Sequence, residues 1–503
     1  MFNIASLAEK FPTVLKPEQR LNFNTKAKWT LIILVIYFIL GSITVWGIQA
    51  AAVSRFDFLE IVFGSKFGSL ITLGIGPIVT ASIILQLLVG SKILNWDTQT
   101  PEGKAKFMGV QKLLAILFCF IEAIAYVTAG AIPPVNAGFF FATIVILQLA
   151  AGGLIIMLMD EVVSKWGFGS GISLFIAAGV AKTIFVRIFA PPLGDASGGI
   201  ISAFISSMGQ GMTTEAFISL APLIATLVVF FIVVFAQDVK IEIPMSFAMP
   251  FGKFGSRRWP LKFIYTSNIP VILTAAVVAN IQLVGRLLYN RGITILGTFD
   301  LSTGTATSGL MMYLTHPSSA SPVVVTVMGG ALALLFAFFA IKYIKKYPLR
   351  MALVGAIVGL ILGYVAITLF NLPPLTTVDI ARSLIYMTMM IVGSVIFSIF
   401  WVMTSGMDAH SVAEQFKSAS IMIPGFRHDP RIVEKVLNRY IPSLTILGGV
   451  FVGFLAGFAD LTSALGTGTG ILLTVMIVYQ LYEQIASQHM EDMNPALRKF
   501  MGE

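Results

Sequence analysis

This chain has few charged side chains and a single cysteine. Charged residues make up 11% of its 503 residues, whereas hydrophobic residues make up 57%. A water-soluble protein of this size could not cover so much apolar surface, so the composition excludes a soluble globular domain and predicts a protein of the lipid bilayer. The lone cysteine, Cys119, excludes a framework of disulfides within the chain.

Sequence features of enzymes and metal sites are also missing. The four histidines, His316, His410, His428 and His489, are scattered without the spacing of metal ligands. The glycine-rich run GTGTG at 466–470 lacks the lysine and the preceding strand of a phosphate-binding loop. We therefore expect a protein that is not an enzyme and that holds no metal or cofactor.

Twelve apolar runs, each of about 20 residues, are long enough to cross a bilayer. They lie at 31–50, 71–91, 113–132, 135–159, 167–187, 216–237, 263–285, 321–341, 351–371, 383–404, 440–459 and 461–482. With the N-terminus inside, alternation places most of the 33 Lys and Arg on the cytosolic side. The positive-inside rule therefore predicts a multi-pass membrane protein with both termini in the cytosol. No cleavable signal peptide is expected.

The second run, ITLGIGPIVTASIILQLLVG at 71–90, is uncharged but is broken by Gly74, Gly76 and Pro77, and it carries the polar Thr80. Polar groups and helix breakers persist at membrane depth only where protein or a water-filled path satisfies them. The segment therefore predicts the wall of a pathway rather than a lipid anchor.

The stretch before it, SRFDFLEIVFGSKFG at 54–68, is too short to span and too apolar for a free loop. It suits a re-entrant half-helix packed inside the protein on its outer side, although a helix lying on the membrane surface fits the same periodicity.

Two later runs begin with clustered glycines followed by bulky aliphatics, WGFGSGISLFIAAGV at 166–180 and ALGTGTGILLTV at 464–475. Such glycines allow either close helix packing or a kink at the start of a span. Glu122 is an acid deep within a span, and Asn280 and Gln282 are amides in the seventh span, so all three are functional candidates, although a hydrogen bond to a neighbouring helix would also explain each one.

Together with YTSNIPVILTAAVVANIQ at 265–282, GMDAHSVAEQF at 406–416 and IPGFR at 423–427, these motifs resemble the SecY-type protein-conducting channel from end to end. The form GIGP, in place of a bacterial GIMP-like form, resembles the archaeal and eukaryotic branch of that family.

The resemblance implies an all-α integral membrane protein, a ten-helix channel of two inverted five-helix halves around an hourglass pore. It divides the chain into a cytosolic arm (1–29), a first half (30–215), a second half in two parts (216–320 and 372–490) and a cytosolic tail (491–503). It implies a plug at 54–68 and a pore ring of aliphatic side chains, namely Ile75, Val79, Ile172, Ile176, Ile272 and Leu473. An apolar constriction of this kind blocks ions by dewetting.

The same resemblance implies a lateral gate, through which apolar segments pass sideways into lipid, with Thr80, Glu122 and Asn280 as its polar cluster. It also implies two basic cytosolic loops that dock a ribosome through Arg257, Arg258, Lys262, Arg427 and Arg431, since phosphates of ribosomal RNA would contact them. Retention on the cytosolic side would explain the same charges.

The expected partners are the ribosome, nascent secretory and membrane proteins, single-span SecE-type and beta-type subunits, a route through the signal recognition particle receptor, and membrane lipids. The chain departs from the family at 321–371, where two apolar runs flank the basic turn KYIKKYPLR. We interpret them as an inserted transmembrane hairpin, which gives about twelve spans.

Two other functions suit parts of the sequence. A secondary transporter of a small solute would also have inverted repeats and broken helices, with Glu122 as a proton site. A membrane insertase without a through-pore is the third possibility, and the predicted plug argues against it. A ring of aliphatics and large basic loops favour the protein-conducting channel, because a solute site should be polar.

Overall fold

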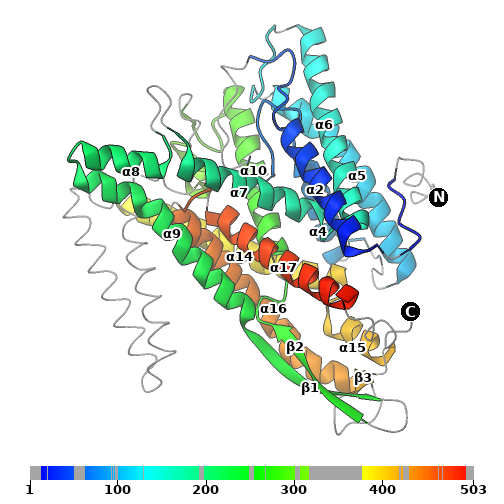
Figure 1. The fold of residues 1–503 in the computed structure, drawn as a ribbon. Helices are drawn as coiled ribbons and strands as arrows, with labels where there is room; N and C mark the ends of the chain where they lie inside the picture. Colours follow the sequence, from blue (N-terminus) through cyan, green and yellow to red (C-terminus); the bar gives the residue numbers. More distant parts are fainter. Residues whose placement is uncertain are drawn as a thin grey trace.

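The computed structural model describes residues 13–493 except 20, 50–59, 61–62, 92, 95, 97–99, 129, 137, 192–197, 249–253, 267, 301–305, 316–375, 419–420, 423–429, 463 and 467. Among the described residues, nine helices are long and apolar enough to cross a membrane (Figure 1). The predicted hairpin at 321–371 lies outside the described residues.

The helices fall into two groups of five. The first group consists of α2 (Phe23–Leu40), α4 (Gly76–Gly90), α5 (Pro101–Thr128), α6 (Phe139–Trp166) and α7 (Gly171–Phe189). The second consists of α9 (Thr213–Asp238), α10 (Ile269–Asn290), α14 (Thr377–Ser405), α16 (Pro430–Leu461) and α17 (Gly468–Met493). Shorter helices are α8 (Ile200–Gly209), α11 (Gly309–Leu314) and α15 (Ala409–Ser418). The prediction of a mainly helical membrane protein is confirmed.

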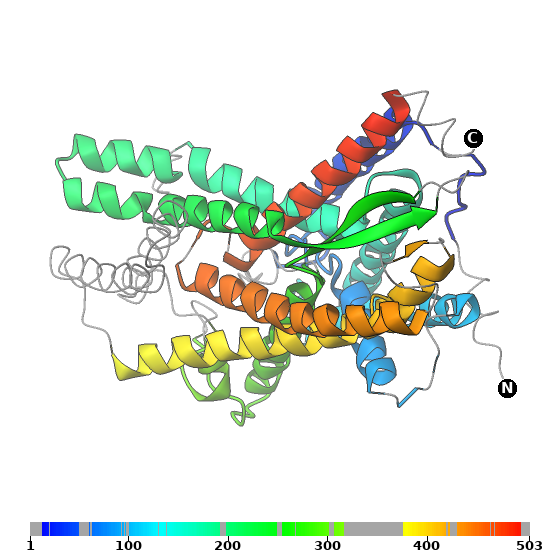
Figure 2. The same cartoon turned by 90° about the horizontal axis from the view of Figure 1, so that it is seen from below.

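The two groups meet along two seams. On one side α4 packs against α10 and α14, and on the other α17 packs against α7 and α2 (Figure 2). Within the second group, α16 approaches α14 closely because glycines line the contact; a Cβ on Gly453 would lie 2.6 Å from the carbonyl oxygen of Met390. Small residues of this kind let membrane helices pack backbone to backbone.

Ten of the twelve predicted spans coincide with these helices, but the predicted bounds of the first are wrong. The apolar run 31–50 predicts a helix to residue 50, whereas α2 begins at Phe23 and ends at Leu40. Beyond it the chain is irregular, and its backbone bonds to other loops: Val45 N donates to Gly68 O at 3.0 Å and Gln49 N to Pro133 O at 3.0 Å. Tertiary pairing therefore overrides the apolar periodicity there.

A small antiparallel sheet was not predicted. Strands β1 (Lys240–Ala248) and β2 (Phe254–Lys262) form a hairpin, and β3 (Ile421–Met422) pairs with β1, so the order is β2-β1-β3. The two predicted basic loops are therefore parts of one unit at one end of the helical body (Figure 1). Tyr265 Oη also links them by donating to Met407 O at 2.7 Å. Burial, with a smaller effect of Asp408, raises the pKa of Tyr265 to about 12, so its phenol stays a donor near neutral pH.

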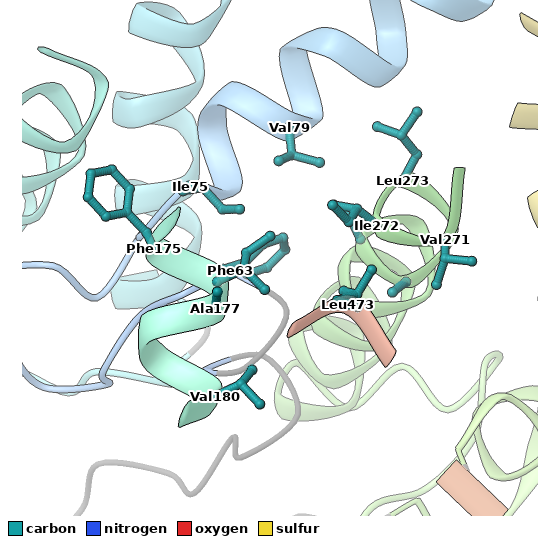
Figure 3. Close-up of a cluster of buried hydrophobic side chains, with 14 of the residues drawn as sticks. Phe63, Ile75, Val79, Phe175, Ala177, Val180, Val271, Ile272, Leu273 and Leu473 are labelled. Atoms are coloured by element: carbon teal, nitrogen blue, oxygen red, sulfur yellow. The ribbon is translucent and has the colours of Figure 1, made fainter. Parts of the chain in front are cut away.

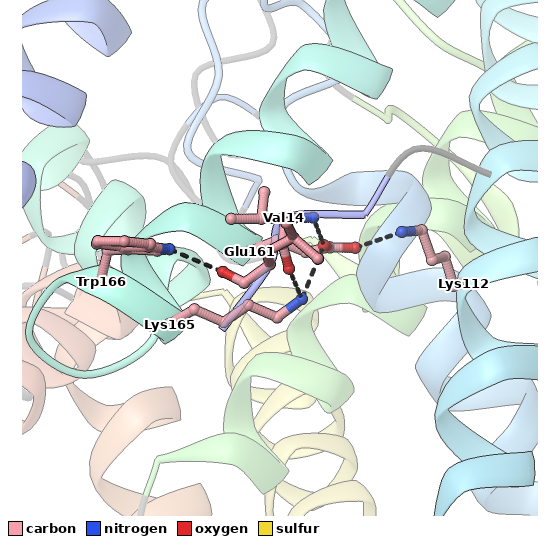
Figure 4. Close-up of polar contacts among 6 residues, drawn as sticks. Val14, Lys112, Glu161, Lys165 and Trp166 are labelled. Carbon is pink, nitrogen blue, oxygen red and sulfur yellow. Dashed lines mark hydrogen bonds and ion pairs between the residues drawn. The ribbon is translucent and has the colours of Figure 1, made fainter. Parts of the chain in front are cut away.

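The N-terminal arm is fixed to the ends of α5 and α6 through Glu161 (Figure 4). The carboxylate of Glu161 accepts from Val14 N at 3.0 Å and pairs with Lys112 Nζ at 2.5 Å and Lys165 Nζ at 3.2 Å. Lys165 Nζ also donates to Val14 O at 2.6 Å, and Trp166 Nε1 donates to Leu15 O at 2.9 Å. We call these contacts the arm clamp.

Candidate functional site: an apolar constriction beside a polar seam

The six aliphatic side chains predicted as a pore ring come from four different helices or their starts. Five of them, Ile75, Val79, Ile176, Ile272 and Leu473, are less than 5% exposed, and Ile172 is partly buried. Figure 3 shows Ile75, Val79, Ile272 and Leu473 gathered around one space, with Phe63 among them. The structure therefore brings together, in one apolar cluster, side chains that lie almost 400 positions apart in the sequence.

The Gly-x-Gly-Pro break places Ile75 and Val79 at this point. Gly74 has a φ of +51°, and a Cβ there would lie 2.1 Å from the carbonyl oxygen of Phe63, so only glycine fits. Helix α4 starts two residues later with Pro77 in its first turn, a position that proline favours. The break therefore joins the helix to the segment before it, since Ile75 N donates to Phe63 O at 2.8 Å.

Of the predicted plug at 54–68, the structure describes Glu60 and 63–68. Residues 63–68 form turns, so the prediction of a half-helix is wrong for this part. The turns are held because Tyr37 Oη donates to Gly64 O at 2.8 Å and Glu60 Oε1 accepts from Phe67 N at 2.7 Å. Phe63 is fully buried beside the constriction.

A cavity of about 520 Å³ opens on one side of the constriction. Val79, Ile172 and Ile272 of the predicted ring belong to its lining, together with other apolar side chains such as Phe107 and Trp401. The polar side chains of the lining come mainly from the predicted cytosolic ends of α4, α5, α7, α10, α14 and α17. Apart from Lys104 they are neutral amides and hydroxyls: Ser82, Gln86, Gln111, Ser170, Ser173, Asn268, Thr404, Ser405, Gln480 and Gln484. Amides and hydroxyls both donate and accept hydrogen bonds, so these groups can pair with the backbone of a polypeptide.

The three residues predicted as a gate cluster are hydrogen-bonded in series. Thr80 Oγ1 donates to Glu122 Oε1 at 2.8 Å, and Asn280 Nδ2 donates to Thr80 Oγ1 at 3.2 Å. The first bond joins α4 to α5 within one half, whereas the second crosses the seam from α10 to α4. Glu122 is 7% exposed, and its Oε2 has no hydrogen-bond partner among the described residues.

The residues predicted to dock a ribosome lie at the sheet end. Arg257 and Arg258 stand in β2, opposite Met245 and Pro244 of β1. Arg431 is exposed at the start of α16, and Arg427 lies outside the described residues. Lys262, the fifth predicted docking residue, is held in an ion pair with a residue of α17.

The Lys262 side chain forms an ion pair with Glu483 of α17 and is 40% exposed. It therefore braces the base of the hairpin against α17, a contact that could not be foreseen from a count of basic residues.

Two carboxylates, the partly buried Asp160 and the buried Asp460, were not predicted as site residues, yet each accepts hydrogen bonds at the start of the next long helix. The available signal was the spacing: Asp160 precedes Gly167 by seven residues and Asp460 precedes Gly466 by six, and each of these glycines is the first of its cluster.

The fold and the constriction define a helical membrane protein with an apolar closure between two halves, the architecture of a channel. The family model SecY matches residues 69–482. The chain is 40% identical to the protein translocase subunit SecY of Methanococcus vannielii over 499 residues, covering 99% of each chain. It is also 40% identical to that of Methanocaldococcus jannaschii over 501 residues, covering all of both.

Solved structures agree with these relatives. One described as the structure of a protein conducting channel has a TM-score of 0.77 at 40% identity, with 98% of both chains covered. Another, described as Sec61 in the canine ribosome-channel complex from the endoplasmic reticulum, has a TM-score of 0.75 at 40% identity and the same coverage. The chain belongs to the SecY family.

Proposed function

We propose that this chain is the protein-conducting channel of a secretory translocon, which passes unfolded polypeptides across the membrane and releases apolar segments into lipid. The observation that carries the proposal is the convergence of Ile75, Val79, Ile272 and Leu473, from three helices, in one apolar cluster, of which Val79 and Ile272 also line a cavity of about 520 Å³. An aliphatic constriction dewets and blocks ions, and it can deform around a chain of any sequence. Conduction of this kind needs no catalytic residue.

The cavity supplies the entry to this constriction. A segment lying in it meets amides and hydroxyls as well as apolar side chains, among them Val79, Ile172 and Ile272 of the ring. A plug built from the segment around Phe63 would then have to move, because Phe63 is fully buried beside the constriction. That movement also breaks the hydrogen bonds of Tyr37 to Gly64 and of Ile75 to Phe63. At the ring itself a polypeptide meets aliphatic side chains, whose contacts do not depend on its sequence, so the passage needs no specific recognition.

Sideways release uses the seam of α4 and α5 with α10 and α14. Thr80, Glu122 and Asn280 act there as the polar cluster of the gate, because separating the halves breaks the Asn280–Thr80 bond while the Thr80–Glu122 bond within the first half is kept. An apolar helix that reaches the open seam gains free energy by leaving water for lipid, and a polar chain continues outward.

Ribosome docking is assigned to the sheet unit through Arg257, Arg258, Arg427 and Arg431. The support is the pairing of β3 with β1, which joins two basic loops into one surface, and the similarity to a channel described in complex with a ribosome. Phosphate groups of ribosomal RNA are the chemistry that such arginines bind.

Further parts of the proposal follow from family membership. The chain would lie in the cell membrane with both termini in the cytosol, and it would assemble with SecE-type and beta-type single-span subunits. Nascent chains would reach it by the signal recognition particle receptor route. The predicted hairpin at 321–371 is a departure from the family, and its apolar composition is what supports a place at the periphery, facing membrane lipids.

The most direct test is a crosslink to a chain in transit. A photoreactive residue in place of Val79 should crosslink to a stalled translocating polypeptide, because Val79 lines the cavity. The same probe in place of Leu147, which is 55% exposed on α6, serves as the control and should not react with that polypeptide. A transporter of small solutes would give no crosslink at either position, and that outcome would refute the proposal.

A further inference from the structure

In the first half, an aspartate at the end of one helix holds the start of the next. Asp160, on α6, accepts from Ile172 N through Oδ1 at 2.8 Å, and Ile172 is the second residue of α7. The approach is close, because a Cβ on Gly171 would lie 2.5 Å from Asp160 Cα. The first backbone N–H groups of a helix have no partner within the helix, so a carboxylate at this place can accept hydrogen bonds from them. The positive end of the helix dipole also stabilises the negative charge of the carboxylate.

In the second half, Asp460 does the same for α17. Asp460 lies at the end of α16 and is 2% exposed. Its Oδ1 accepts from Thr469 N at 2.9 Å, and Thr469 is the second residue of α17. Its Oδ2 accepts from the hydroxyl of Thr469 and from Tyr386 Oη of α14, the latter at 2.7 Å. Asp460 therefore ties three helices together.

The two arrangements agree in position from the glycine turn onward, although the aspartate lies 12 positions before its donor in the first half and 9 in the second. Gly169, three residues before Ile172, has a φ of +72°, and Gly466, three residues before Thr469, has a φ of +73°. In each half a left-handed glycine turns the chain, and the second backbone N–H of the new helix then donates to the aspartate of the preceding helix.

The spacing to the pore ring is also the same. Ile176 follows Ile172 by four residues, and Leu473 follows Thr469 by four residues. Since an α-helix rises 1.5 Å per residue, each ring side chain stands about 6 Å along the helix from the hydrogen bond to the aspartate. Because α7 and α17 run in opposite directions in the predicted topology, one aspartate acts from the cytosolic side and the other from the outer side.

We propose that Asp160 and Asp460 are a symmetric pair of positioning residues, which set the depth of α7 and α17 and thereby seat Ile176 and Leu473 in the closed constriction. The inference rests on the assignment of the ring under the proposed function. A helix that loses its carboxylate can slide or tilt about the glycine before it, which moves its ring side chain away from the constriction, whereas the overall bundle is still held by the packing of the other helices.

The test measures ion leak through the purified translocon complex in proteoliposomes, scaled to the amount of folded complex. Asp160→Ala and Asp460→Ala should each raise the leak several-fold. Asp160→Asn should restore most of the seal, because the amide oxygen can still accept from the backbone. Asp460→Asn should restore it only in part, because one oxygen cannot replace the two that accept from Tyr386 and Thr469.

Two further variants distinguish a specific effect on the ring from a general loss of stability. Asp379→Ala removes a carboxylate from the first turn of α14, where Thr376 Oγ1 donates to it at 2.6 Å, but α14 carries no ring residue and the leak should not change. Thr469→Val removes one donor to Asp460 and keeps the helix, so it should leak moderately even if Asp460→Ala does not fold.

The ion leak of the double variant Gly466→Ala with Asp460→Ala should be smaller than the sum of the leaks of the two single variants, because both substitutions act on the start of α17. Val79→Gly is the reference for an opened ring. If Val79→Gly leaks and the aspartate and Thr469→Val variants stay sealed, the positioning role is wrong and the ring assignment stands. If Val79→Gly itself stays sealed, the ring assignment fails. An equal leak from Asp379→Ala would also overturn the positioning role.

Discussion

The amide of Asn280 donates a hydrogen bond to the hydroxyl of Thr80 at 3.2 Å, and this bond crosses the seam between α10 and α4. The two residues are 200 positions apart in the sequence. Thr80 is already held within its own half by Glu122, so it presents a fixed acceptor to Asn280. The bond is therefore a direct polar link between the moving parts of the proposed gate.

Removing this link should make the gate easier to open. Asn280→Leu eliminates one hydrogen bond, worth about 1 kcal/mol, which corresponds to roughly a fivefold shift toward the open seam. We expect weakly apolar segments to be inserted into lipid more often, as measured by glycosylation of test segments in a reconstituted translocation reaction. Gln282→Leu is the matched control, because Gln282 bonds to Leu314 O within the second half. Equal effects of both variants would contradict the assignment.

Opening the ring should let ions through. Replacing Ile75, Val79, Ile172 and Ile176 together with glycine removes the aliphatic groups that exclude water, so the conductance of reconstituted membranes should rise well above that of the unsubstituted complex. Leu147→Ser, at an exposed position on α6, alters an aliphatic residue outside the constriction and should leave the conductance low. An unchanged conductance of the glycine variant would show that these residues do not form the seal.

Charge reversal should distinguish the proposed docking role of Arg258 and Arg427 from the structural role of Lys262. Arg258→Glu with Arg427→Glu should weaken co-sedimentation with ribosomes by tenfold or more at low salt, since each reversal replaces attraction to phosphate by repulsion. Lys262→Glu should also weaken it, but through loss of the pair with Glu483. The swap Lys262→Glu with Glu483→Lys should then recover binding, whereas no second-site change at Glu483 should rescue the arginine variants. Undiminished ribosome binding by the arginine variants would remove the docking assignment.

The arm clamp should protect the N-terminal arm from protease. Glu161→Gln removes the charge that faces Lys112 and Lys165, and hydrogen bonds to charged groups are worth roughly 1.5–3 kcal/mol. Chymotrypsin should therefore cleave after Leu15, which is exposed and whose carbonyl oxygen accepts from Trp166 in the clamp, about tenfold faster, as followed by mass spectrometry of the released peptide. Glu102→Gln, an exposed acid at the start of α5, is the control. Equal cleavage of both variants would show that the clamp does not hold the arm.

Much of the helical layout could be predicted from the sequence. Apolar runs near 20 residues identified ten of the helices, because a bilayer demands that length and excludes charge. The end of α2 could not be predicted, since residues beyond Gly41 are as apolar as the helix but find backbone partners near Gly68. The sheet was missed because β1 and β3 are 173 or more positions apart, and their pairing depends on contacts across the chain.

Some features of the candidate site could likewise be predicted from the sequence, and others could not. The Gly-x-Gly-Pro break, the two glycine clusters and the polar residues in otherwise apolar spans are visible in the sequence, because each breaks a rule that lipid imposes. Family resemblance then named the ring and the gate cluster. Tertiary structure alone decided that Lys262 faces Glu483 and that Asp160 and Asp460 hold the starts of α7 and α17. The physical reason is that hydrogen bonds and ion pairs depend on distances of about 3 Å between side chains, and only the packed helices fix those distances.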